Sequence, residues 1–167
     1  TKLNLAALGL SDFEEDIKGV FDLNMTSLKP EELTGTFKVK QLALGTLNVG
    51  ELSGDFINEK SKHIAKIESP FLKVNLQGEF DYYALPDILA AEVNGYFKQD
   101  SVVYKEIPGK RDFELKAEVL EHPIWQVFVP ELAFDKSIKL NATLNEDKLK
   151  GEMNFGNLTY GDMLFKD

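Results

Sequence analysis

The chain has 167 residues, no cysteine and a formal net charge of -9. Its length fits one domain with a sizeable core, and 43% hydrophobic with 28% charged residues is typical of a folded protein. The acidic balance argues against nucleic-acid binding and against electrostatic adsorption to anionic lipid headgroups, since both need clustered Lys and Arg. The lack of cysteine excludes disulfides, thiolate metal sites and cysteine nucleophiles.

The sequence begins with Thr1, shows no signal peptide and contains apolar runs of only a few residues. No run therefore reaches the roughly 20 apolar residues of a transmembrane helix. We expect residues 1–167 to form a single segment cut from a longer protein, with 98–112 as the one stretch where it could subdivide.

The N-terminal part predicts a helical turn followed by two strands. Residues 11–14, Ser-Asp-Phe-Glu, form a capping-box pattern of the kind that begins helices. Apolar or small residues then alternate with polar ones over 17–25 and over 33–39, and a Lys-Pro-Glu-Glu turn at 29–32 joins the two stretches. A period of two is typical of a strand with one buried face.

The middle of the chain predicts three more strands and a helix. The alternation is less regular over 47–57 and 62–69 and is cleanest over 72–80. Residues 85–97 instead carry apolar side chains at helical spacing, with Pro86 suited to the first turn. A polar loop follows this predicted helix.

The C-terminal part predicts three strands and one irregular apolar stretch. Alternation returns over 113–119, 138–144 and 149–155, and 145–148 is typical of a tight hairpin turn. The proline-bounded stretch 122–130 has no clear period. The whole pattern predicts a mainly β chain of eight or nine antiparallel strands with one or two short helices.

A Gly-x-Phe motif recurs along the chain, and in the predicted strands its glycines lie on the apolar face. Glycine usually weakens a strand, so its repetition needs a reason. The glycines could bend the sheet or admit a neighbouring phenylalanine ring, or the bend could curl the sheet around a ligand. The motif begins at Gly19, Gly35, Gly54, Gly78 and Gly95, with a degenerate copy at Gly151.

The sequence contains no recognisable catalytic or metal-binding constellation. His63 and His122 have no carboxylate or histidine at ligand spacing, and nucleophile elbows, phosphate loops and dinucleotide fingerprints are absent. The acidic runs at 14–16 and 31–32 lack the alternating oxygen-ligand spacing of a calcium loop. Core or edge packing explains Trp125 better than a binding role does. We therefore expect no enzyme activity, no cofactor and no metal site.

One stretch resembles a known repeat. Residues 62–81, Lys-His-Ile-Ala-Lys-Ile-Glu-Ser-Pro-Phe-Leu-Lys-Val-Asn-Leu-Gln-Gly-Glu-Phe-Asp, place a strand that ends near serine before an alternating strand that closes with Gly-x-Phe. This arrangement resembles the repeat of the TamB family, the translocation and assembly module proteins related to AsmA, in the versions of Bacteroidota-type bacteria. The sequences Val-Pro-Glu-Leu at 129–132 and Leu-Thr-Tyr-Gly at 158–161 also fit that repeat.

The resemblance implies a fold, a location and two candidate functions. The fold would be a β-taco, an elongated antiparallel sheet curled into an open apolar trough. The location would be the periplasm of a Gram-negative bacterium, with an inner-membrane anchor outside this segment. The function would be to bind or conduct phospholipid in the trough and so support outer-membrane biogenesis. The alternative is a protein-interaction scaffold or chaperone for outer-membrane protein or autotransporter assembly with a BamA-like barrel.

The alternation indicates which side chains would line such a trough. A one-sided sheet must hide its apolar face in a sandwich, a barrel or a trough, and an exposed apolar face of that size normally binds something. We also expect the edge strands to associate with other copies, or to be masked by residues 122–134. The candidate lining residues, which would contact lipid, are Phe21, Leu23, Phe37, Val39, Phe56, Leu72, Val74, Leu76, Phe80, Phe113, Leu115, Val119, Ile138, Leu140, Leu144, Met153 and Phe155.

Overall fold

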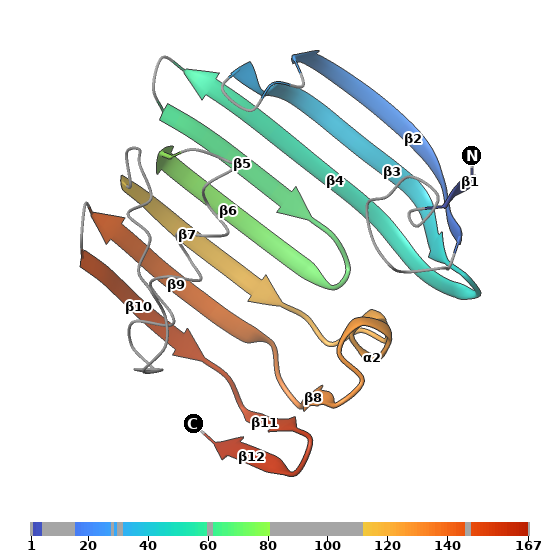
Figure 1. The fold of residues 1–167 in the computed structure, drawn as a ribbon, viewed down its shortest axis with the longest axis vertical. Coiled ribbons are helices and arrows are strands. Elements are labelled where there is room, and N and C mark those ends of the chain that lie inside the picture. The colour runs from blue at the N-terminus through green and yellow to red at the C-terminus, as the bar shows by residue number, and fades with distance from the viewer. Residues whose placement is uncertain are drawn as a thin grey trace, which may run out of the picture.

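The structure, a computed structural model, describes residues 2–4, 16–27, 29, 32–59, 62–80, 112–145 and 148–166. Its main feature is a nine-stranded antiparallel sheet, which confirms the predicted mainly β, antiparallel architecture. The strands follow one another across it in chain order, apart from one excursion after β7 (Figure 1). In spatial order they are β1 (Lys2–Asn4), β2 (Asp16–Ser27), β3 (Thr34–Leu44), β4 (Leu47–Glu59), β5 (Lys62–Glu68), β6 (Leu72–Glu79), β7 (Asp112–Val119), β9 (Ile138–Asn145) and β10 (Lys148–Asn154).

A second sheet of three strands contains pairings that the alternation did not predict. After β7 the chain forms the short helix α2 (Ile124–Phe128) and strand β8 (Leu132–Phe134) before it returns to the large sheet as β9. Strand β8 pairs with β11 (Asn157–Tyr160), which pairs in turn with β12 (Met163–Lys166). The strand within 122–134 therefore pairs with β11 and with neither outer strand of the large sheet, β1 or β10; association with other copies, the alternative expected for the edges, stays a prediction.

Several predicted features lie outside the described residues. These are the capping-box turn at 11–14, the helix at 85–97 with its Gly95 motif, and nearly all of the stretch 98–112. The two predicted turns, at 29–32 and 145–148, fall between β2 and β3 and between β9 and β10. Helix α2 is the single α-helix in the described part of the chain.

Two residues explain why the alternation is irregular near the β3–β4 hairpin. On β3 the apolar positions are odd-numbered up to Val39 and even-numbered from Leu42, and Gln41 between them has a φ of 54°. On β4 the parity changes in the same way at Gly50, whose φ is 97°. The β3–β4 register shifts at this level, as it does at β-bulges. The extra residue in each strand keeps the apolar side chains on one face, so 47–57 cannot show a single clean period.

The motif glycine Gly54 makes room for a neighbouring phenylalanine ring. Gly54 on β4 pairs with Phe37 on β3, and a Cβ atom at position 54 would collide with the Phe37 ring. That ring stacks beside Phe56, with the ring centroids 5.9 Å apart. This is one of the two structural reasons predicted for the motif, and at this position it is confirmed.

The turn between β5 and β6 is held by one buried serine. The hydroxyl of Ser69 donates to the carbonyl oxygen of Leu72 at 2.9 Å and accepts from the Leu72 backbone N–H, also at 2.9 Å. A buried hydroxyl is costly unless it is paired, and here both of its roles are used. The Ser69 side chain thus fixes the start of β6.

Candidate functional site: the apolar face of the large sheet

The cross-strand register arranges apolar residues in rows that run across the large sheet. Side chains at positions i and i+2 of a strand share a face, so adjacent rows lie on the same side, here called the apolar face. One row consists of Leu23, Phe37, Gly54, Ile67, Val74, Ala117, Leu140 and Met153. The next row consists of Met25, Gly35, Phe56, Ala65, Leu76, Leu115, Ala142 and Gly151.

The predicted lining residues fall on or beside this face. Two of them follow strand ends: Phe80 comes after β6, and Phe155 comes after β10 and belongs to no row. The Phe80 ring meets Phe113 edge to face, with centroids 6.0 Å apart. The remaining lining residues pair with apolar or small residues on neighbouring strands.

The centre of the apolar face is a packed core. Leu144 is 0% exposed, Phe113 is 2% exposed and Leu76 is 5% exposed. These residues form one cluster with Ala65 and Phe80, and the partly buried Phe56, Val74, Leu115 and Leu149 pack against it. The strands that carry this cluster are therefore stabilised by ordinary hydrophobic burial.

The outer strands leave part of the apolar face accessible. Leu23 on β2 is 65% exposed and Met153 on β10 is 53% exposed. Of the other lining residues, Val39 is buried as well, and the rest are partly buried: Phe21, Phe37, Phe56, Leu72, Val74, Leu115, Val119, Ile138, Leu140 and Phe155. The predicted lining set thus divides into a closed centre and open margins.

A second cluster, which the sequence analysis missed, covers the end of the apolar face at the β3–β4 hairpin. Ile124 of α2 packs with Leu44 and Val49. Trp125 packs edge to face on Phe71, with centroids 5.7 Å apart, and its indole N–H donates to the carbonyl of residue 120 at 2.8 Å. The preference for a packing role of Trp125 is thereby confirmed. The change of parity on β3 and β4 was the signal that could have located this cluster.

The two histidines occupy packing and turn positions. His63 on β5 lies in a row of the apolar face, opposite Gly78, and its ring is 5.4 Å from that of Phe80. His122 precedes α2, where its Nδ1 accepts from the backbone N–H of Ile124 at 3.1 Å. In the described ranges no group of three or more His, Asp or Glu side chains is placed to hold a metal ion.

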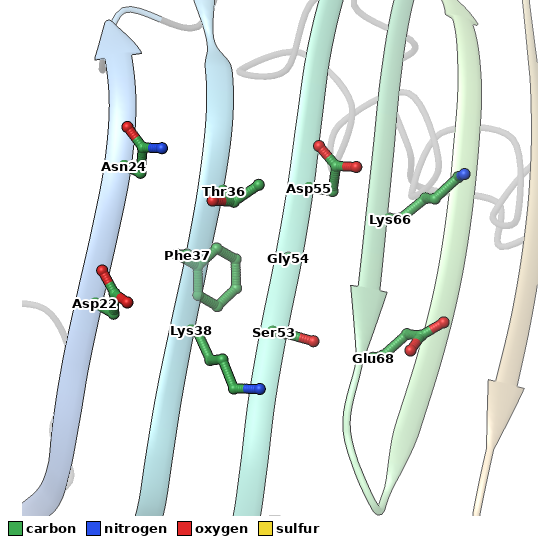
Figure 2. Close-up of a pocket in the computed structure, with 10 residues that line it drawn as sticks. All are labelled: Asp22, Asn24, Thr36, Phe37, Lys38, Ser53, Gly54, Asp55, Lys66 and Glu68. Atoms are coloured by element: carbon green, nitrogen blue, oxygen red, sulfur yellow. The ribbon is translucent and has the colours of Figure 1, made fainter.

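The opposite face of the sheet is charged and carries a shallow depression of about 500 Å³. Figure 2 shows polar side chains of β2, β3, β4 and β5 around it. Lysines and carboxylates are interspersed here, and Lys38 pairs with Glu51 at 2.6 Å. Such alternation is typical of a solvated face. Its polar lining residues are Asp22, Asn24, Thr36, Lys38, Ser53, Asp55, Lys66 and Glu68, and Phe37 and Gly54 of an apolar row also border it.

One carboxylate on the charged face has a shifted pKa. Hydrogen bonds from Lys116 and Gln77, at 2.8 Å each, lower the pKa of Glu114 from its ordinary value. A lowered pKa keeps the group ionised, which is the opposite of what a general acid needs. This carboxylate acts as a cross-strand partner.

No protein-family model, no curated protein and no solved structure matches this chain. Among the described residues, none of the helical structure is long and apolar enough to cross a membrane. The fold defines an antiparallel β-sheet protein whose large sheet has a linear strand order. One face of that sheet is apolar and the other is charged.

Proposed function

We propose that this chain is a segment of an envelope-spanning periplasmic protein that binds or conducts phospholipid and supports outer-membrane biogenesis. In this proposal the large sheet curls into a β-taco, and the apolar face lines its trough. The observation that supports it best is the unbroken run of apolar rows from β2 to β10. A continuous apolar surface can contact an acyl chain along its length.

The β2 margin is the proposed first point of lipid contact. Leu23 is exposed, and Phe21 and Phe37 beside it are only partly buried. Each acyl methylene removed from water there contributes about 0.8 kcal/mol. Conduction requires the packed centre to open as well, because a lipid that crosses the strands from β5 to β9 must displace the contacts there.

Lipid extraction followed by mass spectrometry, on protein purified without detergent, tests the proposal. Wild-type protein is expected to carry phospholipid, and Leu23→Arg should reduce the amount severalfold because it places a charge at the margin. Val20→Arg is the matched control: Val20 lies on the same strand, is 56% exposed and belongs to the opposite face. Protein that carries no phospholipid, or equal loss in both variants, contradicts the proposal.

A second candidate function is a scaffold that presents strand edges to an outer-membrane client working with a BamA-like barrel. It is favoured by β10, which is the last strand of the large sheet among the described residues and offers an edge to an added strand. Lipid-free protein that captures β-strand peptides would support this function. Capture should then be lost when Met153 on β10 is replaced by proline, which cannot donate to an added strand.

A further inference from the structure

The three-stranded sheet has an apolar face that extends to its outer strand. Its register forms two apolar rows on one side of the sheet. Strand β12 contributes the last residue of each row, Met163 and Phe165, and both are exposed. The rows are Leu132, Tyr160 and Met163, and Phe134, Leu158 and Phe165.

Among the described strands β12 pairs with β11 alone, so its outer side has no partner within that part of the chain. Only Gly161 and Asp162 separate Tyr160 from Met163, and in such a hairpin the pair beside the turn exchanges hydrogen bonds, after which bonding alternates. The backbone N–H and C=O of Leu164 therefore point away from β11. An apolar edge of this kind is a template for another strand.

We propose that β12 pairs antiparallel with β12 of a second copy of this chain, about a two-fold axis at Leu164. The sequence is self-complementary under that symmetry: Met163 meets Phe165, and Asp162 meets Lys166. Opposite charges then face each other at both ends of the contact. An in-register parallel pairing would instead oppose aspartate to aspartate and lysine to lysine, so charge complementarity selects the antiparallel arrangement.

The same symmetry joins the apolar rows of the two small sheets. In an antiparallel pair the two copies keep their apolar faces on the same side, so Met163 of one copy extends the row that contains Phe165 of the other. The contact covers flanks of side chains that are exposed in a single copy. It is small, so the dissociation constant should be on the order of 10 µM to 1 mM.

Sedimentation velocity of the 167-residue chain, across about 10 µM to 1 mM, measures this association. Asp162→Lys and Lys166→Asp should each weaken it by about tenfold, because each single variant opposes like charges twice. An equimolar mixture of the two variants should restore it, since both contacts then pair opposite charges. Restoration in the mixture is specific to the proposed register, and its absence overturns the proposal.

Leu164→Lys tests the two-fold axis itself. It should abolish association by placing two lysines side by side, while the melting temperature of the single copy is unchanged because Leu164 is 55% exposed. Val20→Lys is the matched control, with a similar exposure on the large sheet. A chain that stays monomeric throughout, or that associates equally well as Leu164→Lys, overturns the proposal. None of these outcomes depends on lipid binding.

Discussion

The large and small sheets place apolar residues by the same alternation, yet the residues end in different environments. At the centre of the large sheet, Leu76 and Leu144 are buried within a cluster contributed by several strands. On β12 of the small sheet, Met163, Leu164 and Phe165 are all exposed. Alternation therefore assigns a side chain to a face, whereas its burial depends on how many neighbouring residues cover that face.

The largest loss of stability is expected from a substitution at the packed centre of the large sheet. Leu76→Arg should lower the free energy of unfolding by roughly 3 kcal/mol or more, since it buries a charge without a partner. The neighbouring Asn75→Arg should change it by less than about 0.5 kcal/mol, because Asn75 is exposed on the charged face. Denaturant unfolding followed by circular dichroism compares the two. A folded and stable Leu76→Arg protein would mean that the centre opens as readily as the margins.

A smaller difference in stability is expected between alanine substitutions at two copies of the glycine motif. Gly54→Ala should cost about 1–3 kcal/mol, because its Cβ would displace the Phe37 ring. Gly151→Ala on the outer strand β10 should be neutral or stabilising by up to about 1 kcal/mol, since the nearest atom to its Cβ lies 3.8 Å away. Thermal unfolding of both variants measures the contrast. An equal loss of stability in both variants would show that glycine is needed for its backbone conformation and not to admit the Phe37 ring.

Loss of the Ser69 hydroxyl from the β5–β6 turn should lower the free energy of unfolding by about 1–2 kcal/mol. Ser69→Ala leaves the backbone groups of Leu72 without their buried hydroxyl partner. Ser53→Ala, on the charged face, should stay within about 0.5 kcal/mol of wild type. Chemical denaturation monitored by Trp125 fluorescence reports both changes. A Ser69→Ala protein as stable as Ser53→Ala would contradict the role given to this turn.

The smallest effect concerns pH and the small sheet. Hydrogen bonds from the side chain of Asn157 at 2.6 Å and from its backbone N–H at 2.7 Å lower the pKa of Asp135 below its ordinary value of 3.8. This carboxylate therefore stabilises the fold above the unfolded-state pKa, and the contribution is lost as the pH falls through the lower folded-state pKa. Amide exchange at Asn157 should accelerate over that range. The same acceleration in Asp135→Asn would rule out this carboxylate as its cause.

The alternation along the chain is sufficient to assign the faces of the strands and most of their positions. Regular stretches such as 72–80 and 138–144 alternate with the geometric period of a strand, so each side chain's face follows from local covalent geometry. For the same reason most predicted lining residues share one face. The role of Gly54 was also among the predicted explanations, because only glycine admits a ring so close to the backbone.

Tertiary contacts set the pairing of β8 with β11, the position of α2 and the division of the apolar face into a closed centre and open margins. These depend on contacts between residues far apart in the chain, such as Ile124 with Leu44, which no local period encodes. The bulges at Gln41 and Gly50 are likewise set by the register between strands. Local sequence fixes the direction of a side chain, but burial is a collective property of all the elements packed around it.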